Sequence, residues 1–435
     1  MMAPPAVEAQ VSSDTSRASG TRAADGPPTD PPRVVAAVEG LSRWIESNGP
    51  AGPDPYDAQS SPFAGAAGLL GRWGRIAFQQ GVLRSPVDLR RWLRIPPRVN
   101  AKAMGLIARA RIDLRVTRGE ARQGELAVES LDWLESHAWR RDGRCGWGYP
   151  FDWAARSFFV PRGTPSVVVT AVVAEAFLAA AAALGRRRYL ELARSAAAFV
   201  LTDLARHESD DGLCFSYTAL DDSRILNASL LGAELLTRVA TAEPGDENAR
   251  ARLLEPARRA LRFVLRQQRA DGAWPYGLAA HHGWVDGHHT GFVLRSLSAL
   301  RQATGWEEIA EPLDRGLRFY DARLIAADGR PLHRLDTPWP ADIHACAEAI
   351  LVFSDPGLLS ARPELLSRAH QVAGWTLARL GRADGSFGFR RHASRTDLTP
   401  YLRWGQAWML RALAQLERSG GAAPSGPPSP TATVD

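Results

Sequence analysis

The segment 271–290, which reads DGAWPYGLAAHHGWVDGHHT, contains four of the ten histidines of the chain. Histidine titrates near neutral pH and is the commonest general acid or base in enzymes. Asp286 lies three residues before His289, so its carboxylate could orient that imidazole and raise its basicity. The residue types and their spacing indicate acid/base chemistry. A histidine near the start of a helix can also serve only in packing or capping.

The same segment raises the question of a metal site. Zinc accepts histidine and aspartate ligands, and four candidates could in principle converge on one ion: Asp286, His288, His289 and His344. However, the chain has no HExxH motif and no cysteine pair, and adjacent histidines rarely bind one ion together. We therefore predict a site without metal and without any other cofactor.

Several other segments carry aromatic and polar side chains of the kind that bind sugars. Aromatic faces stack against sugar rings, whereas Asp, Asn and Arg form hydrogen bonds with hydroxyls and carboxylates. The residues that we assign to substrate binding are Tyr149, Arg156, Tyr217, Arg224, Asn227, Trp274, Tyr276, Trp284, His288, Asp342, His344, Tyr401 and Arg403. Other aromatic residues in these segments, such as Trp147, Trp153 and Phe389, could equally fill the protein core.

An internal repeat indicates which elements position these residues. The dipeptide Asp-Gly begins at positions 142, 211, 271, 328 and 384, with spacings of 69, 60, 57 and 56 residues. A repeat of this length with helical patterning on both sides is typical of helix pairs. We expect each Asp-Gly to end an amphipathic helix, because glycine readily adopts the left-handed conformation that terminates helices. A short aromatic segment and a more apolar helix then follow.

The repeats predict an all-α fold, an (α/α)6 toroid of six helical hairpins over residues 34–418. A sixth unit can be built at the front from an amphipathic helix at 34–47 and an apolar helix at 64–81. Amphipathic outer helices and apolar inner helices are what two concentric layers require. An open solenoid would need polar capping repeats at its ends, and the sequence shows none. Residues 1–33 and 419–435 are rich in Pro, Ala and Ser and are expected to be disordered.

This architecture predicts where a ligand would bind. Parallel inner helices bring all the loops that precede them to one mouth of the ring, together with six helix N-termini, which favour anions. Arginines in these loops suit carboxylates and phosphates. We therefore expect a saccharide ligand that bears a uronate or a phosphate.

Composition excludes several other functions. Net charge is +6, but the arginines are scattered, so we expect no nucleic-acid partner. The apolar segment 166–184 has Glu175 at its centre, which argues against membrane insertion. The cysteines at 145, 214 and 346 lack CxxC spacing, and the N-terminus lacks a secretory signal, so we expect a cytoplasmic protein with reduced thiols. Only one of the 53 basic residues, Lys102, is a lysine, which argues against Schiff-base chemistry. The sequence leaves the oligomeric state open.

Four segments, at 146–171, 217–236, 267–277 and 284–294, resemble bacterial proteins of the VpsJ type, which are found with exopolysaccharide biosynthesis genes. Those proteins are placed among six-hairpin toroids, together with prenyltransferase-like and glycosidase-like rings. Their fourth loop typically reads Asp-Asn-Phe-His-Thr-Gly. Here Asp286 and His289 match that loop, whereas Gly287 and His288 depart from it. The resemblance implies that Asp286 and His289 form the functional pair. It also matches Tyr149, Arg156, Asp221 and Asn227.

Three functions remain open. The first is a carbohydrate-active enzyme of exopolysaccharide biosynthesis, an epimerase, lyase or hydrolase whose catalytic residues are Asp286, His289 and Asp221. The second is an isoprenoid enzyme, because QQRADGAW is similar to the QW repeat of triterpene cyclases. Against it, His344 occupies the place of the catalytic acid of those cyclases, and Ala219 breaks their DxDD pattern. The third is a non-catalytic ring that binds glycans.

Overall fold

The computed structural model describes residues 29–85, 87–154, 159–209, 212–242 and 246–421. Most of the two tails expected to be disordered lies outside these residues, as does Arg156. The first helix, α1 (Pro31–Asn48), begins three residues before the predicted domain boundary. Its start is set by Asp30, whose side chain accepts a hydrogen bond from the backbone N–H of Arg33.

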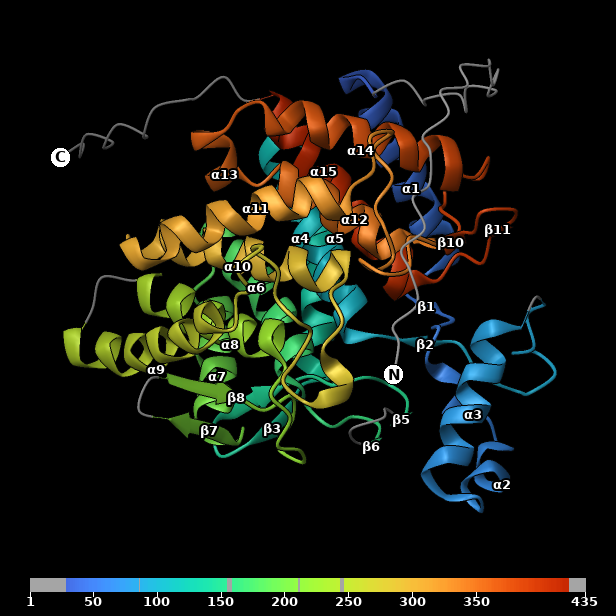
Figure 1. Ribbon diagram of the computed structural model, residues 1–435, viewed down its shortest axis with the longest axis horizontal. Helices are drawn as coiled ribbons and strands as arrows, with labels where there is room; N and C mark the ends of the chain where they lie inside the picture. Colours follow the sequence, from blue (N-terminus) through green and yellow to red (C-terminus); the bar gives the residue numbers. More distant parts are fainter. Residues whose placement is uncertain (1–28, 86, 155–158, 210–211, 243–245, 422–435) are drawn as a thin grey trace, which may run out of the picture.

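The described helices form two concentric layers, which confirms the predicted (α/α)6 toroid (Figure 1). Each inner helix contacts the next, and the last contacts the first, so the ring is closed. The inner helices are α4 (Ala101–Arg118), α6 (Val167–Leu184), α8 (Leu226–Thr241), α10 (Gly287–Thr304), α12 (Ile343–Phe353) and α15 (Ala407–Gly421). The outer helices are α1, α5 (Ala121–Ser136), α7 (Arg187–Thr202), α9 (Glu247–Arg266), α11 (Ala310–Leu324) and α14 (Leu365–Leu380).

The Asp-Gly turns hold the ring together, although they do not end the outer helices as predicted. Helix α5 ends at Ser136, and Asp142-Gly143 forms the turn of a short hairpin that follows it. Gly272, Gly329 and Gly385 have φ of +95°, +87° and +87°, and each lies against the backbone of the next outer helix. The turn at Gly385 contacts Gly40 of α1, so the last repeat closes onto the first helix. A side chain at these glycines would meet that backbone.

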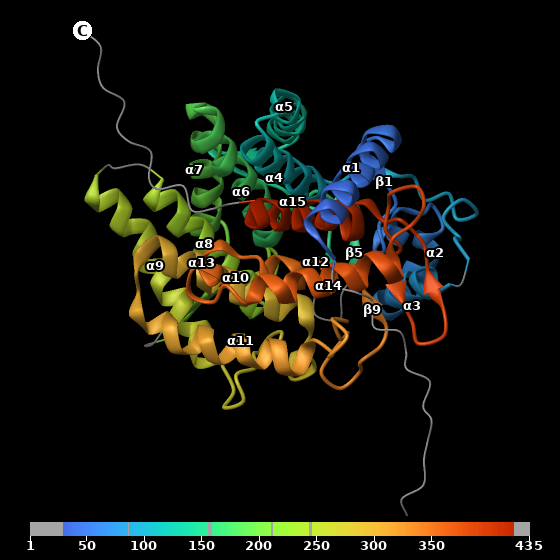
Figure 2. The same ribbon diagram turned by 90° about the horizontal axis from the view of Figure 1, so that it is seen from above.

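The sixth inner helix is α4, not the predicted helix at 64–81. Residues 64–84 instead form α2 (Ala64–Gly68) and α3 (Gly71–Arg84), which project from the ring (Figures 1 and 2). The apolar side chains that suggested an inner helix are exposed there, Leu69 by 87% and Leu70 by 78%. Helix α4 was overlooked because arginines interrupt its apolar pattern; it nevertheless buries Arg111 and Asp113.

Short strands and turns tie the loops together at the mouth of the ring. All strand pairs are antiparallel, and β10 pairs with both β9 and β11, which joins the loop before α15 to the start of α12. The strands are β1 (Ala51–Gly52), β2 (Arg98–Val99), β3 (Trp139–Arg141), β4 (Arg144–Gly146), β5 (Trp153–Ala154), β6 (Phe159–Val160), β7 (Arg206–Ser209), β8 (Gly212–Phe215), β9 (Ala341–Asp342), β10 (Arg390–Arg391) and β11 (Thr396–Asp397). The remaining helical segments are α13 (Pro356–Ala361), 3-10 turns at Asp57–Ser60, Ala280–His282 and Glu307–Ile309, and a π-helical turn at Leu402–Gln406.

Helix α6 explains the long apolar segment of the sequence. Among the described helices it alone has the length and composition to cross a membrane, and 61% of its residues are buried. It lies in the inner layer between α4 and α8. Its central residue, Glu175, pairs with Arg109 and Arg411 inside the ring.

These pairs belong to a belt of charged side chains that crosses the interior near the middle of the inner helices. Every member has a partner of opposite charge within 3.4 Å. The belt consists of Arg109, Asp113, Glu175, Glu234, Arg238, Arg295, Glu348 and Arg411. All six inner helices contribute to it. Because charged groups are costly to bury without partners, this pairing is what allows α4 and α12 to carry charge in the core.

Candidate functional site

A cavity of about 290 Å³ opens where the inner helices begin. Each of the six units contributes to its lining, through the loop before its inner helix or the first turns of that helix. The lining combines histidines, tyrosines and tryptophans with a few charged groups. This is the end of the ring at which the sequence placed the site.

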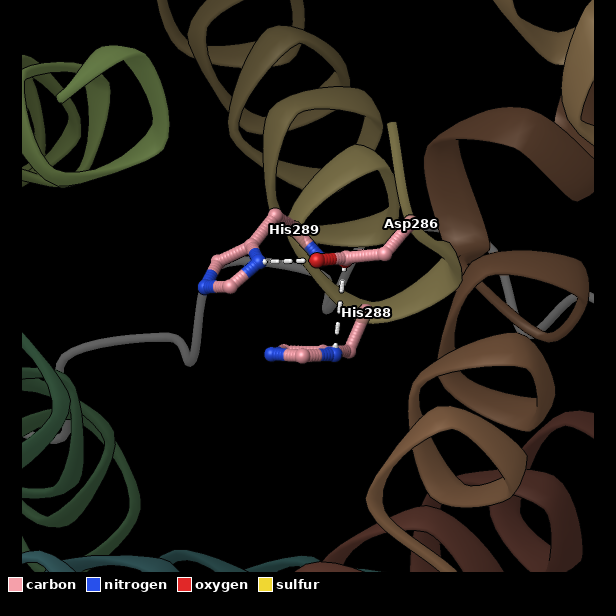
Figure 3. A group of neighbouring side chains, drawn as sticks. All are labelled: Asp286, His288 and His289. Atoms are coloured by element: carbon pink, nitrogen blue, oxygen red, sulfur yellow. Dashed lines mark hydrogen bonds and ion pairs between the residues drawn. The ribbon is translucent and has the colours of Figure 1, made fainter. Parts of the chain in front are cut away.

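Asp286 and the two histidines that follow form the best-defined polar group of the cavity (Figure 3). Asp286 is the N-cap of α10, and its Oδ1 accepts from the backbone N–H of His289 at 2.8 Å. Its Oδ2 lies 2.7 Å from His289 Nδ1 and accepts from Trp284 Nε1 at 3.0 Å. His288 Nδ1 lies 3.4 Å from Oδ1. A sharp turn into the helix therefore places one carboxylate between two imidazoles.

The charge on Asp286 determines how His289 is presented to the cavity. Burial opposes ionisation of Asp286, but the two imidazoles and the hydrogen bonds outweigh it, so the pKa of this carboxyl is held below its usual range. An ionised carboxylate accepts the Nδ1–H of His289. The other ring nitrogen, Nε2, points away from Asp286 (Figure 3) and can accept a proton from a ligand.

The neighbouring histidines are kept neutral by burial. Burial lowers the pKa of His288 to about 3 against the attraction of Asp286, and it lowers the pKa of His344 well below its usual value. The ring of His344 lies between those of His288 and Trp408, at centroid distances of 4.8 and 4.7 Å. Neither nitrogen of His344 has a hydrogen-bond partner among the described residues, although the side chain is buried.

Aromatic side chains form the walls. Tyr276 and Trp284 stack with centroids 4.6 Å apart, and the hydroxyls of Tyr149 and Tyr217 lie 3.3 Å from each other. The guanidinium of Arg403 lies 5.2 Å from the centre of the Tyr149 ring. Flat faces next to hydroxyls are the surface that a sugar ring requires.

The carboxylates and most of the arginines at the cavity pair with one another. Asp342, the N-cap of α12, accepts from the backbone N–H of His344, from Arg390 Nε and from Trp404 Nε1, at 2.9, 2.7 and 2.7 Å. Arg403 binds Asp54 through two hydrogen bonds of 2.5 and 2.6 Å. Arg334 instead lies 4.8 Å over the Trp284 ring. Of the three arginines that line the cavity, Arg390 and Arg403 are therefore neutralised by carboxylates.

The cavity brings together most of the residues assigned from the sequence. Those that line it are Tyr149, Tyr217, Asn227, Tyr276, Trp284, Asp286, His288, His289, Asp342, His344 and Arg403. They lie on five different units, so only the closure of the ring makes them neighbours. Arg156 lies outside the described residues.

Four assigned residues do not line this cavity. Asp221 accepts hydrogen bonds from the backbone and hydroxyl groups of Thr218 and Ser223, and it thereby shapes its own loop. Trp274 is buried behind α10, where its Nε1 donates to the carbonyl of Val264. Tyr401 is buried beneath the guanidinium of Arg90, and Arg224 is exposed. Residue type suggested ligand contacts, but local hydrogen bonding and packing gave Asp221, Trp274 and Tyr401 structural positions.

Several lining residues were not assigned to the site from the sequence, and two of them come from the first unit of the ring. Tyr56 comes from the loop after α1, and Lys102 from the first turn of α4, a helix that the analysis did not find. The signal for Lys102 was its status as the sole lysine of the chain, two residues after Asn100, which caps a helix.

Asp286, His288 and His289 also offer ligand atoms within 4.8 Å of one another. Three protein ligands are the number that catalytic zinc sites use. The Nδ1 atoms of both histidines already face Asp286. An ion bound by this group would therefore replace these contacts rather than add to them.

No protein-family model and no curated protein matches the chain. Solved structures with the same fold do match. A family 76 glycoside hydrolase from a bovine Bacteroides thetaiotaomicron strain superimposes with a TM-score of 0.60 at 11% identity, over 88% of this chain and 77% of that one. An unsaturated glucuronyl hydrolase specific for heparin gives 0.55 at 12%, over 89% and 96%. A cellobiose 2-epimerase from Bacillus thermoamylovorans gives 0.56 at 10%, over 74% and 88%. At these identities the likeness establishes the fold.

Proposed function

We propose that this protein is a carbohydrate-active enzyme that moves a proton to and from a carbon of a saccharide, as an epimerase does. One observation carries the proposal: His289, oriented by Asp286 at 2.7 Å, presents its free nitrogen to a cavity with aromatic walls. An imidazole held in one tautomer by a carboxylate is a general base of moderate strength. In this scheme His289 takes the proton next to the sugar carbonyl, and the tyrosine and tryptophan walls hold the ring.

The carboxylates argue for proton transfer rather than glycoside hydrolysis. Hydrolysis usually needs one carboxylic acid that donates a proton and one carboxylate on the other side of the bond. Among the described lining residues the carboxylates are Asp286 and Asp342, and each accepts from three N–H donors. Such donors stabilise the charged form. The lowered pKa of Asp286 makes it a poor proton donor, and the oxygens of Asp342 already hold Arg390, Trp404 and the start of α12, which leaves histidine as the proton carrier.

The comparisons support the substrate class. The similar folds include proteins named as sugar epimerases, mannanases and glucuronyl hydrolases, all of which act on saccharides. From the VpsJ resemblance and the sequence we further propose that the enzyme acts in a cytoplasmic step of exopolysaccharide biosynthesis. Because the arginines at the cavity are mostly paired, a neutral sugar fits it as well as a uronate.

The proton-transfer function is tested by hydrogen exchange. The protein is incubated in D2O with glucose, mannose, cellobiose or glucuronate, and NMR follows the loss of the proton at C2. We expect exchange with at least one sugar, lost in His289→Gln and kept in His137→Gln, because His137 is an exposed residue that stacks on Trp133. Undiminished exchange in His289→Gln would contradict the proposal. Binding of a sugar without any exchange would favour the non-catalytic glycan-binding ring.

A further inference from the structure

The floor of the cavity contains a side-chain amine that the proposed proton transfer does not use. Lys102 lies at the second position of α4 and is 3% exposed. Its Nζ lies 5.4 Å from the centre of the Phe292 ring and 5.1 Å from that of Trp408. Among the described residues it makes no hydrogen bond and no ion pair. A buried lysine normally has a carboxylate partner, so this position is unusual.

His344 lies against the same two rings as Lys102. Its ring centre is 4.7 Å from that of Trp408 and 5.9 Å from that of Phe292. Both of its nitrogens are buried without a partner, and the same is true of Asn227 Oδ1, which also lines the cavity. Buried polar groups are nearly always hydrogen-bonded. These three atoms, on two side chains of one cavity, indicate that a polar part of the ligand completes their hydrogen bonds.

We propose that this floor is a carbonyl-capture site, where Lys102 forms an imine with the aldehyde of an open-chain sugar. The proposal rests on the proposed function and specifies its substrate class, a reducing sugar. It also reverses the expectation from the sequence, which discounted Schiff-base chemistry because the chain has only one lysine. One amine is sufficient when it lies at the floor of the cavity.

The surroundings favour a reactive amine. Burial, the nearby Arg403 and the absence of a bound carboxylate disfavour the ammonium form, and the pKa of Lys102 is lowered to about 7 in spite of Glu348. A larger share of the amine is then unprotonated at neutral pH than in an exposed lysine, and only that form attacks a carbonyl. The N-terminus of α4 adds a positive partial charge that acts in the same direction.

The covalent steps balance without any further reagent. Nζ adds to the aldehyde carbon, and the resulting carbinolamine loses its oxygen as water, which leaves a C=N bond. Protonated on nitrogen, this bond withdraws electrons from the adjacent carbon, so that His289 can remove the proton there and an enamine forms. Return of a proton to either face of that carbon, followed by addition of water, releases the sugar and restores the amine.

The sole lysine makes reductive trapping a clean test. The folded protein is incubated at pH 7 with glycolaldehyde, and separately with each of the four sugars, in the presence of cyanoborohydride, and peptide mass spectrometry locates the adducts. The α-amino group is the only other amine and serves as the internal reference. We expect Lys102 to be trapped at least about 100-fold faster in the folded chain than in guanidinium chloride, where its pKa returns to about 10.4. Equal rates in the two states, or no adduct at Lys102, would overturn the proposal.

Lys102→Met separates this proposal from the proposed function. Methionine keeps the packing on Phe292 and Trp408 and removes a charge that has no ion-pair partner, so we expect an unchanged or raised melting temperature. Exchange at C2 should fall at least about 100-fold in this variant. If the wild type exchanges and the variant does so equally fast, the amine has no role and the proton-transfer function stands. If Lys102 is trapped but no sugar exchanges, the capture site stands and the proposed function fails.

A second inference concerns the projecting region and rests on separate observations. Of the ten large hydrophobic side chains that are exposed in the described residues, six lie between 63 and 92. Four of them are Phe63, Leu69, Leu70 and Trp73, at or between α2 and α3; we call these the tip cluster. Figures 1 and 2 both show α2 and α3 projecting away from the ring.

The projecting region is also strongly basic. Residues 62–98 contain seven arginines and one acidic residue, a difference of +6, which equals the net charge of the whole chain. Four of these arginines are exposed and make no ion pair in the described structure: Arg72, Arg84, Arg91 and Arg94. Exposed leucine and tryptophan next to arginine are the features of segments that lie in the interface of anionic membranes.

We infer that the projecting region docks on the surface of a bilayer that contains anionic phospholipid. Such docking differs from membrane insertion of a helix. In co-sedimentation, the protein should bind vesicles of phosphatidylcholine with phosphatidylglycerol, bind pure phosphatidylcholine vesicles several-fold less, and dissociate as salt rises.

The tip cluster is tested with a matched control. The triple variant Leu69→Ser, Leu70→Ser and Trp73→Ser should lose at least about 10-fold in vesicle binding, whereas Leu220→Ser with Leu398→Ser, which changes exposed residues of the ring, should bind as the wild type does. Undiminished binding by the triple variant would overturn the inference. So would a dimer in light scattering that the triple variant converts to a monomer, because the cluster would then face a second copy of the chain.

Discussion

The interior of the ring has two polar regions that differ in one respect, the pairing of their charges. In the charge belt every member pairs with a residue of opposite charge, and most of these pairs join different inner helices. At the cavity floor, Lys102 and His344 are 3% and 2% exposed, and neither forms an ion pair within the part of the chain that the structure describes. The belt balances its own charges and therefore supports the fold, although Arg109 Nε, Glu348 Oε2 and Arg411 Nε make no hydrogen bond among the described residues. The polar groups of the floor are not balanced by opposite charges, and we infer that a ligand binds them. Burial of a polar residue is thus uninformative about function until its partners are known.

The largest effect that this comparison predicts is on stability, in the belt. Arg411→Met removes one buried partner from each of Asp113 and Glu175, which keep Arg109, and leaves these carboxylates with fewer counter-charges. Breaking a buried pair in this way costs about 3–5 kcal/mol. Urea unfolding should show a loss of that size, while Arg43→Met, at an exposed position, should change stability by less than about 0.5 kcal/mol. Equal stability of the two variants would show that the belt does not support the fold.

The second prediction concerns activity at the cavity. Asp286→Asn keeps a residue that can cap α10, but an amide no longer holds the tautomer of His289 through a charged hydrogen bond. The rate of C2 exchange should fall about 100- to 10,000-fold with a loss of stability below about 1.5 kcal/mol. Exchange should survive treatment with EDTA. A rate that EDTA abolishes and zinc restores would instead assign Asp286 and the histidines to a metal.

The third prediction is a dependence of stability on pH. Burial lowers the pKa of His288 from 6.5 to about 3, so below pH 6.5 the unfolded chain binds a proton that the folded protein does not bind. Stability therefore decreases as pH falls from 6.5 toward 3, by about 1.4 kcal/mol per pH unit for this residue. Urea unfolding at pH 7, 6 and 5 should give a slope that His288→Gln reduces by about that amount. An identical slope in the variant would show that His288 is not held neutral.

The smallest predicted effects distinguish Trp274, which belongs to the core, from Trp284, which belongs to the cavity wall. Trp274→Phe loses the hydrogen bond to Val264 and should lower stability by about 1–3 kcal/mol without altering exchange. Trp284→Phe loses a donor to Asp286 on the cavity wall and should slow exchange several-fold with little change in stability. Measuring both quantities for both variants decides the assignment. Slower exchange in Trp274→Phe would show that Trp274 contributes to the site, as the sequence predicted.

The sequence predicted those structural features that depend on residues close together in the chain. Amphipathic outer helices and the Asp-Gly spacing predicted the toroid, because periodicity and turn residues act within one repeat. The same approach failed for α4, whose arginines are tolerated in the core only because Asp113 and Glu46 pair with them. The loops of five of the six units that line the cavity were predicted, but the start of α4, which carries Lys102, was not. Asp221 and Trp274 were assigned by residue type, although hydrogen bonds within their own repeats give them structural positions.

By itself, therefore, the sequence determined the ring, the end at which its loops gather and the pairing of Asp286 with His289, since a carboxylate at an N-cap reaches the residue three positions later within one turn. Only the tertiary structure decided which charged groups are neutralised and which face the cavity. Asp54 and Arg403, 349 residues apart, pair with each other, whereas Lys102 meets Phe292 and Trp408 but no carboxylate. The physical reason is that the state of a buried charge depends on its neighbours in space, and in a closed ring those neighbours come from opposite ends of the chain.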